Sequence, residues 1–282
     1  MTLKPQFGKI EFARWEWVVM RILFALFVLR PTVVFHLTEV VGTPVPIGIA
    51  QFVDLGFLSA SPWASVLPWC GYLLLGLYAL GLFPAVVTVL LLVMHVLYGT
   101  LFNSQGAIHH TAQIVGYVLV GQVLCHLLRR RPGPADLIHA SQQLIAAAYV
   151  VSGISKLVAT GGMWVRDIPN IALQFEKNQL MEYYNTLVPP AEAANRGAIG
   201  FIAEHPDLAR LLFGGGLALE LFAVLALWNR GMLALFGIGL WLLHASISEL
   251  MHLGFAYNKW VLAIFFINLP FWAARIYSRV TR

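Results

Sequence analysis

Charged residues are scarce in this sequence. Asp, Glu, Lys and Arg make up only 11% of its 282 residues, whereas hydrophobic residues make up 59%, and the mean hydropathy is +0.76. A soluble protein carries about 25% charged residues, so a soluble globular domain is excluded. Disorder is excluded as well, because it requires low hydrophobicity and many charges. The composition therefore predicts a polytopic integral membrane protein with an apolar, lipid-facing surface.

Cysteine is also scarce, since the chain has only Cys70 and Cys125. Two cysteines exclude a disulfide scaffold and a cysteine-based zinc site. The predicted membrane segments place the two residues at depths that differ by roughly 20 Å at about 1.5 Å per helical residue, which is beyond the reach of a disulfide. We therefore expect both thiols to be free and buried.

The N-terminal region lacks the pattern of a cleaved signal peptide. Residues 1–14 are polar and basic, and no small-residue cleavage site follows the first apolar run, so we expect that run to be a permanent span. The net charge of +5 and the pI of about 9.4 indicate a positive cytoplasmic rim more than nucleic-acid binding. No nucleic-acid partner is expected.

Long apolar runs fill most of the chain. A membrane-spanning helix needs about 20 mostly apolar residues, and the sequence then predicts an all-α bundle of about eight transmembrane helices. The bundle forms a single transmembrane domain over residues 1–282. The eight predicted spans are Trp15–Leu37, one on either side of the Gly81–Pro84 break, Ala107–Leu128, Asp136–Ala159, Leu208–Trp228, Gly231–Met251 and Tyr257–Ala274.

The basic clusters agree with one orientation in the membrane. Cytoplasmic loops carry an excess of Lys and Arg, and eight spans put every basic cluster, and both termini, on the cytoplasmic side. The same topology leaves residues 160–207 outside, where apolar and charged residues alternate as in an amphipathic surface helix or re-entrant lid. A plain linker is the alternative. The basic clusters are Lys4, Lys9 and Arg14; Arg129–Arg131; Arg230; and Arg275, Arg279 and Arg282.

Several ionisable residues fall inside the predicted spans, where they mark a functional site or a specific partner. Tyr149, Ser152 and Lys156 recur at i, i+3 and i+7 and so share one helix face. Glu220 lies near the middle of its span, and a bare carboxylate there is prohibitive. The alternative to a functional role for Glu220 is a buried pair with an arginine of the first span, either Arg21 or Arg30. Lys156 has an alternative of its own, because its amine can reach the headgroups by snorkelling.

Histidines collect in the outer half of the predicted bundle. His109 and His110 open one span, one and two turns before Gln113 and Tyr117, and His244 shares a face with Ser248 and His252. A hydrogen bond within the bundle is the simpler explanation for any one of them. Adjacent histidines diverge by about 100° on a helix and cannot both reach one ion. No acidic and histidine pair repeats across helices, so no metal is expected.

Three segments together resemble the vitamin K-dependent γ-glutamyl carboxylase family, within the wider horizontally transferred transmembrane domain (HTTM) superfamily. The segment from Tyr149 to Leu157, followed by Trp164, is similar to that family's Gly-x-x-Lys-Leu and Trp signature. Gly216 to Ala223 resembles its glycine- and leucine-rich helix with one acidic residue. His244 to Tyr257 resembles its histidine helix, and the His109–His110 pair its other histidine site.

The resemblance implies a vitamin K-dependent carboxylase-like lyase of the bacterial inner membrane, which uses a reduced naphthoquinone (menaquinol or vitamin K hydroquinone) with O₂ and CO₂. Lys156 would be the general base, because a lysine desolvated in an apolar bundle is held neutral. His109, His110 and His244 would orient or electrostatically support the bound quinone. The remaining cofactor-binding residues would be Tyr149, Ser152, Trp164, Tyr117, Glu220 and His252.

The chain also departs from the family pattern. Ser155 stands where the family has a second lysine, and no large region for docking a protein substrate follows before Arg282. A small or lipid-soluble substrate is therefore expected in place of a docked protein. The alternative function is a non-catalytic subunit that binds quinone or lipid within a larger membrane assembly.

Overall fold

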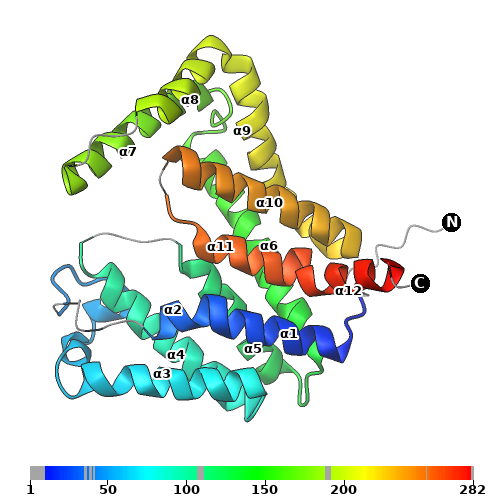
Figure 1. The fold of residues 1–282 in the computed structure, drawn as a ribbon. Coiled ribbons are helices and arrows are strands. Elements are labelled where there is room, and N and C mark those ends of the chain that lie inside the picture. Colours follow the sequence, from blue (N-terminus) through cyan, green and yellow to red (C-terminus); the bar gives the residue numbers. More distant parts are fainter. Residues whose placement is uncertain are drawn as a thin grey trace.

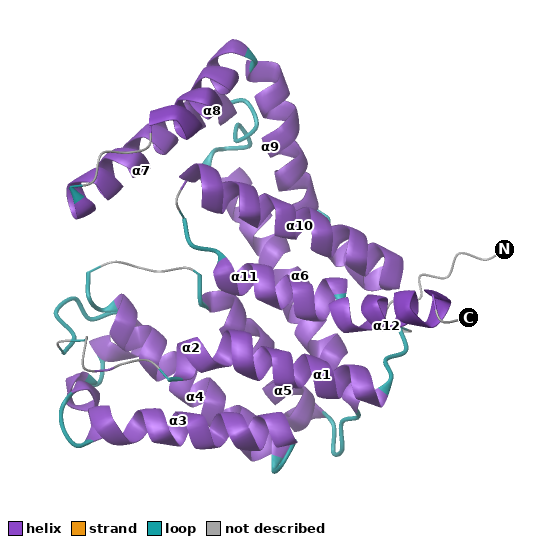
Figure 2. Ribbon diagram, in the orientation of Figure 1, coloured by secondary structure: helices purple, strands orange, loops and turns teal. Residues whose placement is uncertain are grey.

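The computed structural model describes residues 10–34, 37, 40, 42–106, 111–187, 192–251 and 253–280. Every regular element in these residues is a helix, and no strand occurs among them, as Figure 2 shows. The all-α prediction is therefore confirmed for the part of the chain that the structure describes.

Most helices follow one another with short connections, whereas a longer segment separates α2 from α3 (Figure 1). The described residues also form π-helices at Ala25–Leu29 and Leu262–Ile267, and 3₁₀ turns at Gly48–Gln51, Gly56–Ser59, Ile168–Asn170 and Ala223–Trp228. The α-helices are α1 (Arg14–Phe24), α2 (Arg30–Val33), α3 (Trp63–Leu80), α4 (Pro84–Asn103), α5 (Gln113–Leu128), α6 (Pro134–Ala159), α7 (Ile171–Thr186), α8 (Glu192–Glu204), α9 (Pro206–Leu221), α10 (Arg230–Met251), α11 (Ala256–Val261) and α12 (Leu269–Val280).

Four described helices are long and apolar enough to cross a membrane. They are Trp63–Leu80, Pro84–Asn103, Pro134–Ala159 and Arg230–Glu249. A fifth span results if the pair Ala256–Ile267 and Leu269–Ser278, bent by 47°, is counted as one. The structure is therefore compatible with a multi-pass membrane protein and shows four or five such helices, fewer than the eight predicted.

The remaining predicted spans are short or change their helical form. Pro31 has no N–H to donate to the carbonyl of Phe27, and the preceding turn widens into the π-helix Ala25–Leu29 between α1 and α2. The segment Leu208–Trp228 is α9 followed by a 3₁₀ turn, and Ala107–Leu128 contains α5 with 16 residues. Apolar run length alone does not reveal such changes.

The Gly81–Pro84 break forms a tight turn between α3 and α4, as predicted. Gly81 ends α3 in the left-handed conformation (φ 75°), and the N–H of Leu82 donates to the carbonyl of Leu77 at 2.9 Å. This is the pattern of a Schellman C-cap. Pro84 then begins α4, where its missing N–H costs nothing.

The helices share one apolar core, and α7, α8 and α9 form an arm at its edge. Figure 1 shows this arm at the top, standing away from α1, α3 and α4, with α12 and the start of α1 on the right. Inside the arm, Ile168, Phe175, Ile202 and Ala209 form a separate small buried cluster. The described residues between 160 and 207 are therefore largely helical.

Three distant segments meet at the end of the bundle that carries the termini. Glu16 of α1 is 2% exposed and pairs with both terminal nitrogens of Arg230, at 2.8 and 2.9 Å. Asn268 Nδ2 donates to the same carboxylate at 2.6 Å. Asn268 has a left-handed backbone (φ 55°) and precedes Pro270, so it interrupts the helix between α11 and α12.

The expectation that both cysteines are buried is wrong for Cys70. Both thiols are free, but Cys70 is exposed and only Cys125 is buried. Cys70 follows Trp69, which is 73% exposed on the outward face of α3. An apolar thiol needs no burial on a helix face that meets lipid.

Candidate functional site

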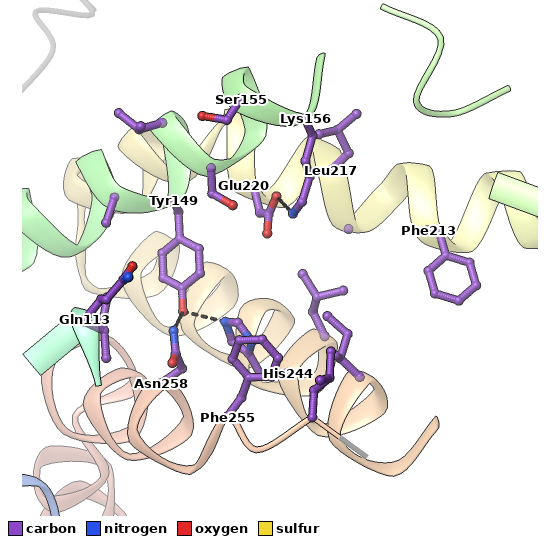
Figure 3. A pocket seen from close by; sticks show the side chains of 18 of the residues that line it. Gln113, Tyr149, Ser155, Lys156, Phe213, Leu217, Glu220, His244, Phe255 and Asn258 are labelled. Carbon is purple, nitrogen blue, oxygen red and sulfur yellow. Dashed lines mark hydrogen bonds and ion pairs between the residues drawn. The ribbon is translucent and has the colours of Figure 1, made fainter. Parts of the chain in front are cut away.

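A cavity of about 630 Å³ lies among α5, α6, α9, α10 and α11. Its volume is within the range of about 300–1,000 Å³ that is typical of small-molecule sites. Seven residues that the sequence analysis selected line it, and Figure 3 shows several of them facing one another. These seven are Tyr117, Tyr149, Ser152, Lys156, Trp164, Glu220 and His244.

Helix α6 supplies one wall of the cavity through its i, i+3, i+7 face, which carries Tyr149, Ser152 and Lys156. Gly153 lets α9 approach this helix closely. A Cβ atom at Gly153 would lie 2.9 Å from Cδ2 of Leu221 and 3.2 Å from its backbone nitrogen. The absence of a side chain at Gly153 therefore brings α9 within reach of Lys156, one turn further along α6.

The Lys156 ammonium forms an ion pair with the carboxylate of Glu220 (Figure 3). Glu220 is thus partnered by a lysine of α6, and the alternative pairing with Arg21 or Arg30 is wrong. The two side chains differ in exposure, at 33% for Lys156 and 5% for Glu220. The carboxylate is buried in the bundle, whereas the lysine stem connects it to the open part of the cavity.

Tyr149, His244 and Asn258 form a hydrogen-bonded chain across the cavity from Lys156 (Figure 3). The Tyr149 hydroxyl lies 2.8 Å from Nε2 of His244, and Asn258 Nδ2 donates to the same hydroxyl at 3.5 Å. Because the hydroxyl oxygen accepts from Asn258, its own proton is available to Nε2. When the hydroxyl donates this proton to Nε2, the histidine proton is on Nδ1.

Two polar atoms of the Tyr149–His244–Asn258 hydrogen-bonded chain are buried without a partner. Among the described residues, neither Nδ1 of His244 nor Oδ1 of Asn258 has a hydrogen-bond partner. With the polarity derived above, the first is a donor and the second an acceptor. An unsatisfied buried polar group costs about 1–3 kcal/mol, so a ligand that bonds to both atoms recovers that energy.

Aromatic rings surround these polar groups. The ring centroid of Phe255 lies 4.7 Å from that of His244, which fixes the imidazole between Phe255 and Tyr149. Trp164 lies beyond the end of α6, with its ring 5.8 Å from Nζ of Lys156. The cavity therefore presents flat apolar surfaces beside a few polar groups, an arrangement that suits a planar aromatic ligand.

Three predicted site residues, His109, His110 and His252, lie outside the described residues. Among the residues that are described, no group of three His, Cys, Asp or Glu side chains is placed to hold a metal ion. The sequence analysis missed Asn258, which lines the cavity from α11. Its only signal was a polar side chain at the start of the last predicted span.

The sequence and the fold were compared with known proteins. No protein-family model matches the chain, and neither the curated proteins nor the solved structures include a match.

Proposed function

We propose that this protein is a carboxylase-like integral membrane enzyme that binds a reduced lipophilic quinone in the cavity beside Lys156. In this proposal the protein has eight membrane spans and both termini in the cytoplasm. Its cavity lies in the outer half of a bacterial inner membrane. The basic residues at the end of the bundle that carries the termini support this orientation through the positive-inside rule. The observation that carries the function is one cavity that combines the Lys156–Glu220 pair with two unpartnered polar atoms.

The residues present fit a reduced naphthoquinone. A hydroquinone hydroxyl both donates and accepts a hydrogen bond, which matches the donor on His244 and the acceptor on Asn258 after a small rotation of either side chain. Trp164, Phe255 and Tyr117 supply flat surfaces against which an aromatic ring packs. His244 and Asn258 would hold one end of the ring, and Lys156 is on the opposite wall.

Lys156 and Glu220 are placed to move a proton together. When bound, the reduced quinone would supply electrons for reaction with O₂, coupled to carboxylation of a substrate by CO₂. Keeping two charges out of water costs several kcal/mol, so a neutral amine beside a protonated carboxyl competes with the charged pair once water is displaced. In that form Glu220 holds the proton, and the Lys156 amine accepts one from a nearby hydroxyl.

The exposure of Lys156 modifies the role that the resemblance implied. Its amine is not isolated in an apolar bundle, because Glu220 pairs with it and a third of its side chain is exposed. A ligand that fills the cavity would remove the remaining water. Base chemistry at Lys156 therefore depends on occupancy of the cavity, which couples proton transfer to binding.

Binding of 2-methyl-1,4-naphthohydroquinone to the purified protein, kept reduced under anaerobic conditions, tests the site through quenching of tryptophan fluorescence. We expect Asn258→Leu and His244→Leu each to raise the Kd about three- to tenfold, since each removes one hydrogen bond. His126→Gln is the matched control, because His126 is outside the cavity lining. Equal affinity for all four proteins would show that the quinone site is elsewhere.

Oxygen uptake by the protein with the same hydroquinone tests catalysis separately. Lys156→Met retains the hydrogen bonds of His244 and Asn258, so binding should persist while uptake falls to the background rate. Glu220→Gln should also lower uptake, because the amine loses its proton acceptor. A Lys156→Met protein that consumes oxygen at the unmodified rate would contradict the base assignment.

A second candidate is a non-catalytic quinone- or lipid-binding subunit, and the α7–α9 arm favours it. An apolar groove of about 730 Å³ lies between the arm and α10, with Phe175, Leu212 and Leu242 among its lining residues. Leu173 and Tyr184 of α7 are also exposed. Purification in mild detergent at native expression separates the two functions. A subunit requires a second polypeptide in fixed stoichiometry, whereas an isolated chain with hydroquinone-dependent oxygen uptake excludes it.

A further inference from the structure

Another cavity lies at the end of the bundle that carries the termini, and it shares no lining residue with the site described above. Its volume is about 330 Å³, and its walls come from the start of α10 and from α12. We call it the Arg275 pocket, and its lining residues are Arg230, Gly231, Phe271, Trp272, Arg275 and Ile276.

The electrostatics of the Arg275 pocket favour an anion. Arg230 is neutralised by Glu16, but no described acidic side chain pairs with the exposed guanidinium of Arg275. Gly231 is the second residue of α10, a helix of 22 residues, so the positive end of its dipole meets the pocket. The pocket therefore carries a net positive potential from one guanidinium and one helix terminus.

The two arginines are fixed in different ways. The guanidinium of Arg230 lies between the rings of Phe12 and Phe271, 4.6 and 4.1 Å from their centroids. Three of its five N–H groups donate to Glu16 and to the carbonyl of Glu11. No described acceptor bonds to the other two. The guanidinium of Arg275 lies 5.9 Å from the centroid of the same Phe271 ring. Both arginines therefore retain donors that a phosphate group can accept from.

The apolar part of the pocket favours a lipid over a soluble phosphate. Trp272 and Ile276 line it one helical turn apart, and Ile276 and the adjacent Tyr277 are 61% and 72% exposed. Helix α12 thus combines basic residues with exposed apolar and aromatic ones, as helices at a membrane interface do. It is the second half of a helix pair, bent by 47°, that counts together as one candidate span.

We propose that the Arg275 pocket binds the phosphodiester headgroup of an anionic phospholipid, with Arg275 and the N-terminus of α10 at the phosphate and Trp272 and Ile276 against the upper acyl chain. Basic pockets between membrane helices bind such headgroups in general. The site is independent of the quinone proposal, because none of its residues lines the larger cavity.

Native mass spectrometry of the detergent-purified protein with equal amounts of phosphatidylglycerol and phosphatidylcholine tests the proposal. We expect preferential phosphatidylglycerol adducts, and Arg275→Gln should weaken them about fivefold, the contribution of one basic residue near an anionic lipid. Arg275→Lys should retain most of the preference. Arg210→Gln is the matched control, since Arg210 is a partly exposed arginine that pairs with Asp207 and is on α9. An unchanged preference in Arg275→Gln would overturn the proposal.

Two further experiments identify the ligand and test the site even if an Arg275 variant misfolds. Glycerophosphoglycerol, which has the headgroup without acyl chains, should not displace the lipid at equal concentration. If it does, the site binds soluble phosphates and the lipid assignment is wrong. Phosphatidylglycerol with brominated chains should quench the unmodified protein more than Trp272→Phe. Equal quenching of the unmodified protein and Trp272→Phe would show that the lipid binds elsewhere. This result does not depend on how the Arg275 variants fold.

Discussion

Replacing Lys156 with methionine leaves the Glu220 carboxyl without its cation, in a place where only 5% of the side chain is exposed. Breaking a buried ion pair on one side costs about 3–5 kcal/mol. The loss of unfolding free energy has an upper bound, because the carboxyl can take up a proton instead. Protonating an ordinary glutamate at pH 7 costs about 4 kcal/mol. We expect a loss of about 3–4 kcal/mol, which is a decrease in Tm of about 6–8 °C for a chain of this size.

The converse substitution should cost less. Glu220→Gln leaves an amine whose side chain is 33% exposed and can keep its contact with water. The loss is then one charge-assisted hydrogen bond, about 1.5 kcal/mol or a Tm decrease of about 3 °C. The double variant Lys156→Met/Glu220→Gln should be more stable than Lys156→Met alone, since no buried charge remains.

Thermal unfolding of the four proteins in one detergent, followed by intrinsic fluorescence at pH 7, measures this asymmetry. The Tm values should fall in the order unmodified protein, Glu220→Gln, double variant, Lys156→Met. Equal losses for the two single variants, or a double variant with the sum of both losses, would refute the buried pair, because independent sites add.

Three shorter predictions concern packing and the cavity. Gly153→Ala should lower Tm by several degrees, because its Cβ would lie 2.9 Å from a side chain of α9, whereas Gly215→Ala on α9 meets nothing within 4 Å and should not lower it. Gly81→Ala should lower Tm because φ is +75° and a guanidinium occupies the space of the new Cβ, whereas Gly76→Ala in the same helix should raise it slightly. Tyr149→Phe removes the hydroxyl that orients the imidazole, and fluorescence titration should show about a fivefold rise in the Kd of the hydroquinone; an unchanged Kd would remove that residue from the site.

Helical periodicity was sufficient to predict which residues share a cavity wall. Tyr149, Ser152 and Lys156 lie on one face of α6 because their spacing matches the turn of the helix. These residues line the cavity together with Glu220 and His244, because polar groups of several spans face the inside of a bundle, where lipid cannot reach them.

The pairings between helices were not predictable in the same way. Glu220 meets Lys156 because Gly153 lets α6 and α9 approach, and periodicity within one helix contains no information on the register between two. Asn258 enters the cavity for the same kind of reason, since it depends on where α11 packs. Four or five of the eight predicted spans are helices long and apolar enough to cross a membrane, and hydropathy does not register the effects of Pro31 and Asn268 on helix continuity.

The contact of Glu16 with Asn268 also bears on how the chain is made. The two residues are 252 positions apart, and Arg230 is 214 positions from the same carboxylate. At a synthesis rate of about 5–20 residues per second, roughly 10–50 seconds pass before the last partner emerges from the ribosome. Until Arg230 is made, the carboxylate has neither cation nor amide and must remain hydrated. The first helix therefore reaches its final depth only when the last one arrives, and a truncated chain would present an uncompensated charge to the insertion machinery.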